Sequence, residues 1–555
     1  MWSDFDSQTN FVINNAWRLI SLQDKEISSP SYGSFHYAYW RDKTSEFPDS
    51  RFQEAGATIG ILSSIKYEKF HGKTLPSKDE LYITFSAALK NLENIQYPDG
   101  SFDEWYKGER GFAATEFTSI AFGLAAICLG DELQIKEREI LNKILLKSGL
   151  WLSKREDKVK SNHQAAGAAA LSIIWKYTKN NIFLESAKKA VELTLKRQTS
   201  EGWFPEIGGM DLGYCSVLLD YLMIYVWITK DKKPIKPLKK LIKFMLPHIH
   251  PDGTISPESG ICINPYVSRV GLCLFAQNSL EGSWILKLIE ANKDFQKVLK
   301  PYLADDLRFC RWSHLPLFCD FLKSDLKFKN EKLKENYYPE GWTIRKNSSL
   351  AAYHNDKIHA YFSISGGGVI RVFNNLNLIF EEEGIVIRDK KMIWNTKGYK
   401  KSRNIYLNTK VLGFVGELHI AKYAFPNFLS RTILRILCIN PLLSKFTRDI
   451  IDSYRLKNSS AINQSAASIS RDSKNIVFKK EISIDENNMF LSYEIDKNKY
   501  LSMADEILVN YSSKNHIIKI SKFEKKILII FQIKLLGRRK IQSFRKVIDI
   551  KNMIN

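Results

Sequence analysis

Asp99-Gly100-Ser101-Phe102 and Glu201-Gly202-Trp203-Phe204 are two copies of one loop, in which an acidic residue precedes a glycine and an aromatic residue follows. Looser copies are Tyr32-Gly33-Ser34-Phe35 and Asp252-Gly253-Thr254-Ile255. Gly100 and Gly202 lie 102 residues apart, and Gly202 and Gly253 lie 51 apart, so a further copy is expected near residue 151, where Gly149-Leu150-Trp151 stands. A period of this length is typical of a repeat architecture.

Each loop lies between two helical patterns of different character. The preceding patterns are amphipathic and cover 81–95, 135–147, 183–197 and 238–246. The following patterns are rich in small or apolar residues and cover 55–64, 117–129, 165–177, 216–228 and 267–276. A helix that is apolar on most faces is buried, whereas one with a polar face lies outside, and the glycine permits the left-handed turn that ends a helix.

These alternating helices predict an α/α toroid, an incomplete or six-pair barrel, over residues 1–325. Residues 284–300 and 312–322 are expected to supply the sixth pair. An open helical solenoid is the alternative, because the period alone does not show that the ring closes.

The pattern changes beyond residue 325. A charged linker is predicted over 326–341, and over 342–555 the period becomes two, with β-branched and aromatic runs such as 358–364, 410–419 and 475–484. These features indicate a C-terminal antiparallel β-sandwich. A basic helical insertion near 426–455 interrupts it, and this insertion either touches a membrane surface or packs on its own domain.

The composition limits the partners. A formal charge of +22 predicts attraction to polyanions, and the sign alone does not choose among acidic polysaccharide, nucleic acid and an anionic membrane. No nucleic-acid motif appears, so no nucleic-acid partner is expected. The seven cysteines form no C-x-x-C pair and are expected to be buried free thiols.

The location and assembly of the protein are less constrained. The opening residues lack the pattern of a secretory signal, and the longest apolar stretch, 214–228, is too short to cross a bilayer. The expectation is a cytoplasmic protein without a transmembrane segment, and a peripheral contact with the membrane is left open. The oligomeric state is left open.

Residues at equal distances past each glycine should occupy equivalent places at the start of an inner helix, at one end of the ring. Asn162 and His163 lie 13 and 14 residues past Gly149, Tyr214 lies 12 past Gly202, and Tyr266 lies 13 past Gly253. The same reasoning brings in Glu116 and Arg269, while Arg51 opens the first inner helix.

This set suits removal of the proton α to the carboxylate of a uronic acid in an acidic glycan. Asn162 or an arginine can neutralise the carboxylate by hydrogen bonding. His163 or Tyr214 can take the C5 proton, and a tyrosine can protonate the departing oxygen. The predicted catalytic residues are therefore Asn162, His163 and Tyr214. The predicted substrate-binding residues are Arg269, Tyr266, Trp203, Glu206, Trp105, Glu116 and Arg51.

A toroid followed by a β-sandwich, with Asn162-His163 on one inner helix and Gly213-Tyr214 on the next, resembles the heparinase II/III and alginate lyase group. The resemblance implies β-elimination, with Asn162 as carboxylate neutraliser, Tyr214 as acid and also base, and His163 as base or positioning residue. Two departures stand out. That group commonly draws a further histidine from the sandwich, where this chain offers only His354 and His359, and it is usually secreted.

Other interpretations stay open. Asn162 can cap a helix, His163 can be a core histidine and Tyr214 a packing aromatic. The same toroid could carry a uronyl C5-epimerase, a glycoside hydrolase or a non-catalytic glycan-binding protein of envelope polysaccharide assembly. A hydrolase would draw two carboxylates from Asp103, Glu104, Glu116, Glu206, Asp211 and Glu258. No cofactor or metal is predicted, because His248 and His250 lack a third ligand.

Overall fold

The structure is a computed structural model of the chain. It describes residues 7–65, 76–207, 209–256, 259–261, 264, 266–291, 303–325, 336–388, 393–396, 403–408, 410–420, 427–457, 477–484, 488–496, 506–511, 514–519, 526–534 and 542–545. Glu258, Cys262 and most of the predicted linker lie outside these residues.

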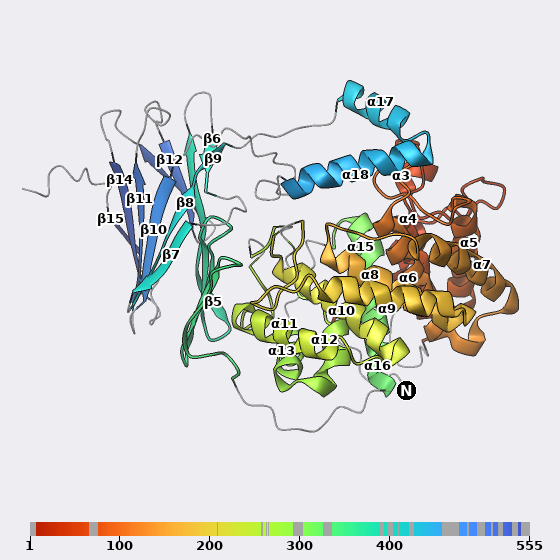
Figure 1. Cartoon of the computed structure of the whole chain (residues 1–555), viewed down its shortest axis with the longest axis horizontal. Helices are drawn as coiled ribbons and strands as arrows, with labels where there is room; N and C mark the ends of the chain where they lie inside the picture. Colours follow the sequence, from red (N-terminus) through yellow and green to blue (C-terminus); the bar gives the residue numbers. More distant parts are fainter. Residues whose placement is uncertain are drawn as a thin grey trace, which may run out of the picture.

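Six inner helices form a closed ring in the N-terminal half (Figure 1). They are α4 (Ser50–Ser63), α6 (Phe112–Leu129), α8 (Ser161–Thr178), α10 (Leu212–Thr229), α12 (Val270–Phe275) and α16 (His314–Asp325). Each packs against the next, and α16 packs against α4. The predicted toroid is confirmed, and the open solenoid is wrong because the last inner helix contacts the first.

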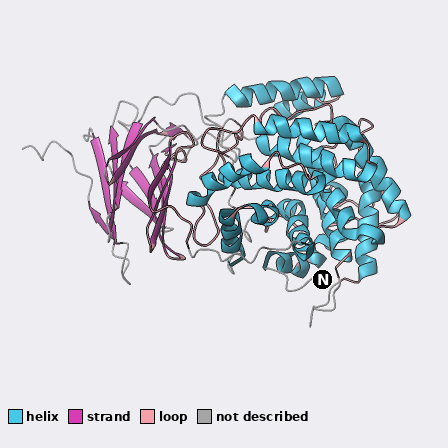
Figure 2. Cartoon of the chain, turned by 60° about the horizontal axis from the view of Figure 1, so that its bottom comes forward, coloured by secondary structure: helices cyan, strands magenta, loops and turns pink. Residues whose placement is uncertain are grey.

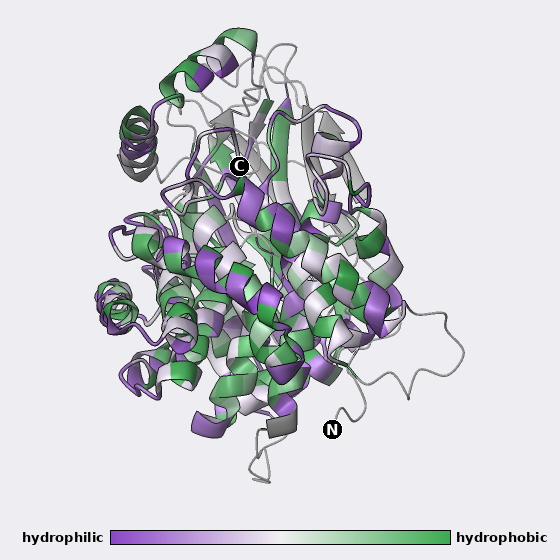
Figure 3. Ribbon diagram, turned by 90° about the vertical axis from the view of Figure 1, so that its right-hand side faces the viewer, coloured by the Kyte–Doolittle hydropathy of each residue, from purple (hydrophilic) through white to green (hydrophobic). Residues whose placement is uncertain are grey.

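The outer helices run between them and are α5 (Lys78–Ile95), α7 (Ile135–Leu152), α9 (Asn181–Leu195), α11 (Ile235–Met245) and α13 (Leu280–Ala291). Hydrophobic and hydrophilic residues alternate along the helices in Figure 3, as expected for helices with one buried face. Shorter helices are α3 (Tyr37–Trp40), α15 (Asp306–Trp312), η2 (Gly130–Glu132), η3 (Leu246–His248) and η4 (Ala276–Asn278).

The inner helix of the sixth pair is confirmed, since α16 covers most of 312–322, but the outer helix differs from the prediction. The helix α13 contacts α11 and α12, so it is the outer helix of the fifth pair, and residues 292–300 lie outside the described part of the chain. The outer side of α16 is instead covered by α1 (Ser7–Asn14), while α2 (Ala16–Ser21) contacts α4. The start of the chain therefore packs against the two helices, α16 and α4, at which the ring closes.

Two inner segments are apolar enough to resemble membrane spans. Residues 112–132 and α10 pass that test by length and composition, but 94% and 67% of their apolar windows are buried inside the protein. Their apolarity is explained by the toroid core, which both helices line.

The repeated glycines act at close approaches between outer helices. Gly33, Gly100, Gly202 and Gly253 all have positive φ, from +76° to +103°. A Cβ on Gly100 would overlap the carbonyl of Lys147 in the next outer helix, and one on Gly202 would meet that of Lys240. Both the conformation and the lack of space therefore require glycine.

Gly149 is different. It lies inside α7 rather than in a loop, and an added Cβ would meet Phe183 of α9 at 2.8 Å. The prediction of a loop copy at this position is wrong, although the glycine again allows two outer helices to approach. At Gly149 the 51-residue period is therefore reflected in the close packing of a glycine, but not in the backbone conformation of that glycine.

The C-terminal half is a β-sandwich of two antiparallel sheets (Figure 2). The first sheet has the order β1-β2-β3-β4-β5-β12-β13, with β6 on β5 and β9 on β6, and the second has the order β15-β14-β11-β10-β8-β7. Ile385 and Ile387 of the first sheet share one core with Phe414, Ile482 and Leu491 of the second. The predicted fold class is confirmed.

The strands of the first sheet are β1 (Gly341–Arg345), β2 (Leu350–His354), β3 (Ile358–Ser363), β4 (Val369–Asn374), β5 (Asn377–Arg388), β6 (Ile393–Asn395), β9 (His419–Ile420), β12 (Glu506–Tyr511) and β13 (Lys514–Lys519). Those of the second are β7 (Arg403–Asn408), β8 (Val411–Glu417), β10 (Val477–Ile484), β11 (Asn488–Asp496), β14 (Lys526–Lys534) and β15 (Gln542–Arg545).

The insertion consists of α17 (Phe428–Leu437) and α18 (Pro441–Lys457) and lies along the edge of the toroid (Figure 1). Arg448 forms an ion pair with Glu109, and the Ser444 hydroxyl donates to the Gly108 carbonyl at 2.7 Å. A Cβ on Gly108, whose φ is +79°, would overlap the Cys438 carbonyl. The expectation that this segment packs on its own domain is wrong, because its partners belong to the toroid.

Among the residues that the structure describes, six cysteines are present, and all are free and buried. The prediction of buried free thiols is confirmed for them.

Candidate active site

The loops at one end of the ring cross from each repeat to the preceding inner helix. The Ser50 amide donates to the Asp103 carbonyl at 3.0 Å, and the Ser161 amide donates to the Pro205 carbonyl at 3.3 Å. The Leu212 amide donates in the same way to the Ser259 carbonyl at 3.4 Å. Because the first amides of a helix have no partner within it, these loops satisfy them and gather the helix starts at one end.

A cavity of about 370 Å³ opens at this end, and it is called the His163 cavity below. It is lined by Trp105, Tyr106, Glu109, Ala113, Asp157, Val159, Lys160, His163, Arg448 and Ile451. The last two come from α18, so the insertion forms one wall of a cavity whose other walls belong to the toroid.

His163 lies in the first turn of α8 and is held by two carboxyl groups. Its Nδ1 is 3.3 Å from Asp157 Oδ2 and 3.5 Å from Glu116 Oε1. Burial, together with the nearby Lys160 ammonium, lowers the pKa of His163 to about 4. The imidazole is therefore neutral at neutral pH, and a carboxylate that accepts from Nδ1–H leaves Nε2 as the basic nitrogen.

The two carboxyl partners of His163 differ in charge. Burial alone would raise the pKa of Asp157, but the hydrogen bond from His163, the Lys160 ammonium and the Lys160 backbone amide lower it below its usual range, so Asp157 is ionised. Burial and the Asp157 charge raise the pKa of Glu116 well above its usual range. Glu116 is fully buried beside His163 and is absent from the cavity lining, so its predicted contact with substrate is corrected.

Asn162 does not cap α8 with its side chain. Its backbone amide donates to Glu206 Oε1 at 2.7 Å, and its own Oδ1 is buried without a hydrogen-bond partner among the described residues. Glu206 is 2% exposed, and burial raises its pKa well above the usual range. Glu206 therefore caps the helix, which corrects its predicted role in substrate binding.

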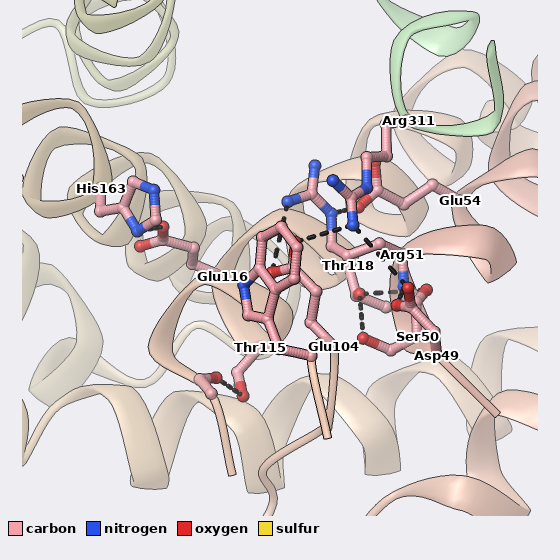
Figure 4. A network of polar contacts seen from close by, with 12 residues as sticks. Asp49, Ser50, Arg51, Glu54, Glu104, Thr115, Glu116, Thr118, His163 and Arg311 are labelled. Atoms are coloured by element: carbon pink, nitrogen blue, oxygen red, sulfur yellow. Dashed lines mark hydrogen bonds and ion pairs between the residues drawn. The ribbon is translucent and has the colours of Figure 1, made fainter. Parts of the chain in front are cut away.

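Charged side chains form a network next to the cavity (Figure 4). Arg311 of α15 contacts Glu104 at 2.7 Å, Arg51 forms an ion pair with Glu54, and the Arg51 guanidinium lies 4.2 Å from the centre of the Phe117 ring. Arg51 and Arg311 hold the pKa of Glu104 below its usual value despite burial. Arg51 is paired with Glu54 and is not among the residues that line the His163 cavity, so its contact with substrate stays a prediction.

Trp105 is the predicted aromatic residue that lines the cavity. It is 67% exposed, and the Arg311 guanidinium lies 5.7 Å from the centre of its ring. Trp203, by contrast, is 7% exposed in the toroid core, with its Nε1 donating to Glu201. Trp203 has no free face for a sugar ring, so that prediction is corrected.

Three other predicted residues lie apart from the lining of the His163 cavity. Arg269 is buried where α12, α16 and α1 meet, 3.5 Å from Asp320 and 3.2 Å from the Thr9 hydroxyl. It stabilises the closed ring, which corrects its predicted contact with substrate. Tyr214 begins α10, where its amide donates to Asp211, and Tyr266 precedes α12; both are partly exposed.

Sequence reasoning missed most of the other lining residues. Asp157 and Lys160 lie three to six positions before His163, and counting from the glycines passed over them because only helix starts were compared. Arg448 lies 285 residues beyond His163 in the chain. No pattern in the sequence links such distant positions.

The sandwich histidines lie at the interface with the toroid. His354 Nε2 is 3.0 Å from the Pro247 carbonyl, and its Nδ1 is 3.1 Å from Nδ1 of His359. The Tyr338 ring stacks on His354 at 4.4 Å, and its hydroxyl donates to the Ile249 carbonyl. These histidines connect the two domains and do not line the His163 cavity.

Comparison with known proteins adds one family match. Residues 76–260 match the family described as the ulvan lyase N-terminal domain. This segment includes Trp105, Asp157, Asn162 and His163, and it is polysaccharide-lyase-like. No curated protein sequence matches the chain.

Solved structures with similar architecture include two polysaccharide lyases. A Paenibacillus xanthan lyase has a TM-score of 0.48 at 9% identity, over 91% of this chain and 46% of its own. The chondroitin AC lyase of Streptomyces coelicolor A3 has a TM-score of 0.45 at 9% identity, over 91% and 67%. A β-L-arabinofuranosidase from Geobacillus stearothermophilus T6 has a TM-score of 0.33 at 9% identity, over 96% and 92%.

This chain spans about half the length of that xanthan lyase. All three TM-scores are below 0.5, so the activities of these proteins are not transferred to it.

Proposed function

We propose that this protein is a polysaccharide lyase that cleaves a uronate-containing glycan by β-elimination at the His163 cavity. The observation that carries the proposal is a neutral histidine held by an ionised carboxylate in an open cavity that is also lined by Lys160. The ulvan lyase match over residues 76–260 supports the same class of reaction.

In this reaction His163 Nε2 takes the proton from C5 of the uronate. The electrons of that C–H bond form a double bond between C4 and C5, and the bond from C4 to the glycosidic oxygen breaks. A base with a pKa of about 4 is unprotonated over the whole physiological range, and Asp157 stabilises the imidazolium that forms.

Lys160 is the cation that can offset the charge of the substrate, since Arg448 is paired with Glu109 in the same lining. A uronate carboxylate bound beside Lys160 would favour the charge that develops at C5. Trp105, which is largely exposed at the same cavity, offers a flat face to a sugar ring.

The departing oxygen requires a proton. Tyr106 lines the same cavity, and burial raises the pKa of its hydroxyl, so it stays protonated at neutral pH. We assign it as the acid, in place of the sequence-based choice of Tyr214, because it shares the cavity with His163.

The test is incubation of the protein with a panel of uronate-containing glycans, followed by ultraviolet absorbance of the unsaturated product. Tyr106→Phe should lower the rate by about 10²-fold or more, as expected for loss of a general acid. Tyr214→Phe is the matched control and should retain the rate within about threefold, because its side chain is outside the described lining of the cavity.

Other outcomes assign another function. New reducing ends without absorbance would mean hydrolysis, and solvent deuterium at C5 without cleavage would mean epimerisation. Binding without turnover would mean a glycan-binding protein. Loss of activity in Tyr214→Phe but not in Tyr106→Phe would restore Tyr214 as the acid.

A further inference from the structure

The α17–α18 hairpin exposes large apolar side chains to solvent. Phe428, Ile439 and Leu442 are 83%, 80% and 78% exposed. The other exposed apolar residues of the hairpin are Leu429, Ile433, Ile436, Leu443, Phe446 and Ile450. Contiguous apolar surface of this kind marks an interaction site rather than ordinary surface composition.

The two faces of α18 have different roles. Ser444 and Thr447 are buried, and Arg448 and Ile451 line the His163 cavity, so these residues face the toroid. Leu443, Phe446 and Ile450 recur at helical spacing on the other side and are about half exposed or more. The apolar face is thus turned away from the rest of the molecule.

The helix α17 is bound loosely to the rest of the protein. It has no buried residue, and its main packing partner is α18. In Figure 1 it lies at the upper edge of the molecule, beyond α18. Four of its apolar side chains, Phe428, Leu429, Ile433 and Ile436, are therefore 49% to 83% exposed.

The charge of the hairpin indicates which kind of partner covers its exposed apolar side chains. The helix α17 contains Arg431 and Arg435 and no acidic residue. Across both helices there are six basic residues against Asp449 and Asp452. Arg435 pairs with Glu46 and Arg448 with Glu109, which leaves four basic residues against these two aspartates. A helix with an apolar face and basic residues beside it binds the surface of an anionic bilayer.

Two other occupants fit less well. A symmetric contact between two copies would bring the arginines of α17 against each other without an acidic partner on that helix, and like charges across an interface are unfavourable. The segment that follows the hairpin, 458–476, is rich in serine and asparagine and contains no aromatic residue. It has little apolar surface with which to cover nine large side chains.

We propose that the α17–α18 hairpin docks this protein on an anionic lipid surface, with the apolar face in the headgroup region. Since the inner face of α18 forms a wall of the His163 cavity, docking holds that cavity close to the membrane. The inference about the substrate rests on the proposed function: a lyase docked in this way would act on an acidic glycan at the membrane surface. The docking itself is independent of the reaction.

The experiment is co-sedimentation of the full chain with vesicles of phosphatidylcholine alone or mixed with phosphatidylglycerol. The wild type should bind the anionic vesicles and bind less as salt rises. The double variant Ile433→Asp/Phe446→Asp should bind the anionic vesicles with an affinity lowered by about tenfold or more. The control is Ile83→Asp on outer helix α5, since Ile83 is 62% exposed and far from the hairpin in sequence; it should bind like the wild type.

Several results would overturn the proposal. These are no binding to anionic vesicles, equal loss of binding in Ile83→Asp, or a dimer in solution that the double variant converts to a monomer. Circular dichroism checks that each variant is folded. Activity on a soluble glycan should be the same in the wild type and the double variant, so failure of docking and failure of the proposed reaction are separate results.

Discussion

Two buried regions of this protein are built around histidines, yet their surroundings differ. At the His163 cavity the imidazole contacts Asp157 and Glu116 and faces open space. At the domain interface His354 contacts a backbone carbonyl, His359 and the Tyr338 ring. Burial lowers the pKa in both regions, to about 4 for His163 and about 3 for His354.

The comparison shows that a lowered histidine pKa does not by itself identify a base. A base also needs a carboxylate that stabilises its charged form and a space in which a substrate can meet it. His163 has both, whereas His354 is enclosed by protein atoms. Three predictions test this distinction, in order of decreasing effect.

The first prediction compares His163→Gln with His354→Gln. The former should lower kcat/KM on the responsive glycan by about 10² to 10⁴-fold, because a general base contributes that much. The latter should change kcat/KM by less than about threefold. Initial rates from the ultraviolet assay measure both, and the comparison fails if His354→Gln is the more damaging substitution.

The second prediction concerns the carboxylate that holds His163. Asp157→Asn should lower kcat by about tenfold to hundredfold with little change in KM, because an amide does not stabilise the imidazolium as a carboxylate does. Glu156→Gln is the control, since Glu156 is a neighbouring carboxylate that pairs with Arg197 instead. An unchanged kcat in Asp157→Asn would remove His163 from the role of base.

The third prediction is a pH dependence of stability at the interface. The pKa of His354 is lower in the folded state, about 3, than the ordinary value of 6.5. As pH falls below 6.5 the unfolded chain binds a proton that the folded chain does not, so stability is lost. Between pH 7 and pH 5 this histidine should cost about 2 kcal/mol.

Urea unfolding of the wild type and His354→Gln at the two pH values measures the contribution of His354 to the free energy of unfolding. The stability difference between the two proteins should shift in favour of the variant at pH 5. A difference that does not depend on pH would show that folding does not shift the pKa of His354.

Much of the fold could be predicted because its signals are local. The period of the glycines and the change from amphipathic to apolar helices follow from neighbouring residues, and the positive φ of Gly100 and Gly202 matches the expected turns. Gly149 misled the prediction because a glycine can serve close packing inside a helix as well as a turn.

The candidate site was predicted only in part. Counting past the glycines selected His163, which lines the cavity, but it equally selected Asn162, which is buried outside the described lining, and Arg269, which is buried in the ring closure. Residues at equivalent positions of the repeat lie at equivalent places in the ring. Their contacts differ, because each copy of the repeat has different neighbours.

The sequence by itself determined a helical ring followed by a sandwich, since hydrophobic period and turn chemistry are properties of short segments. Only the tertiary structure decided that Asp157 holds His163, that Glu206 reaches back to the preceding inner helix, and that Arg448 arrives from an insertion 285 residues away. The physical reason is that a cavity is formed by side chains from separate segments, and their meeting depends on packing of the whole chain.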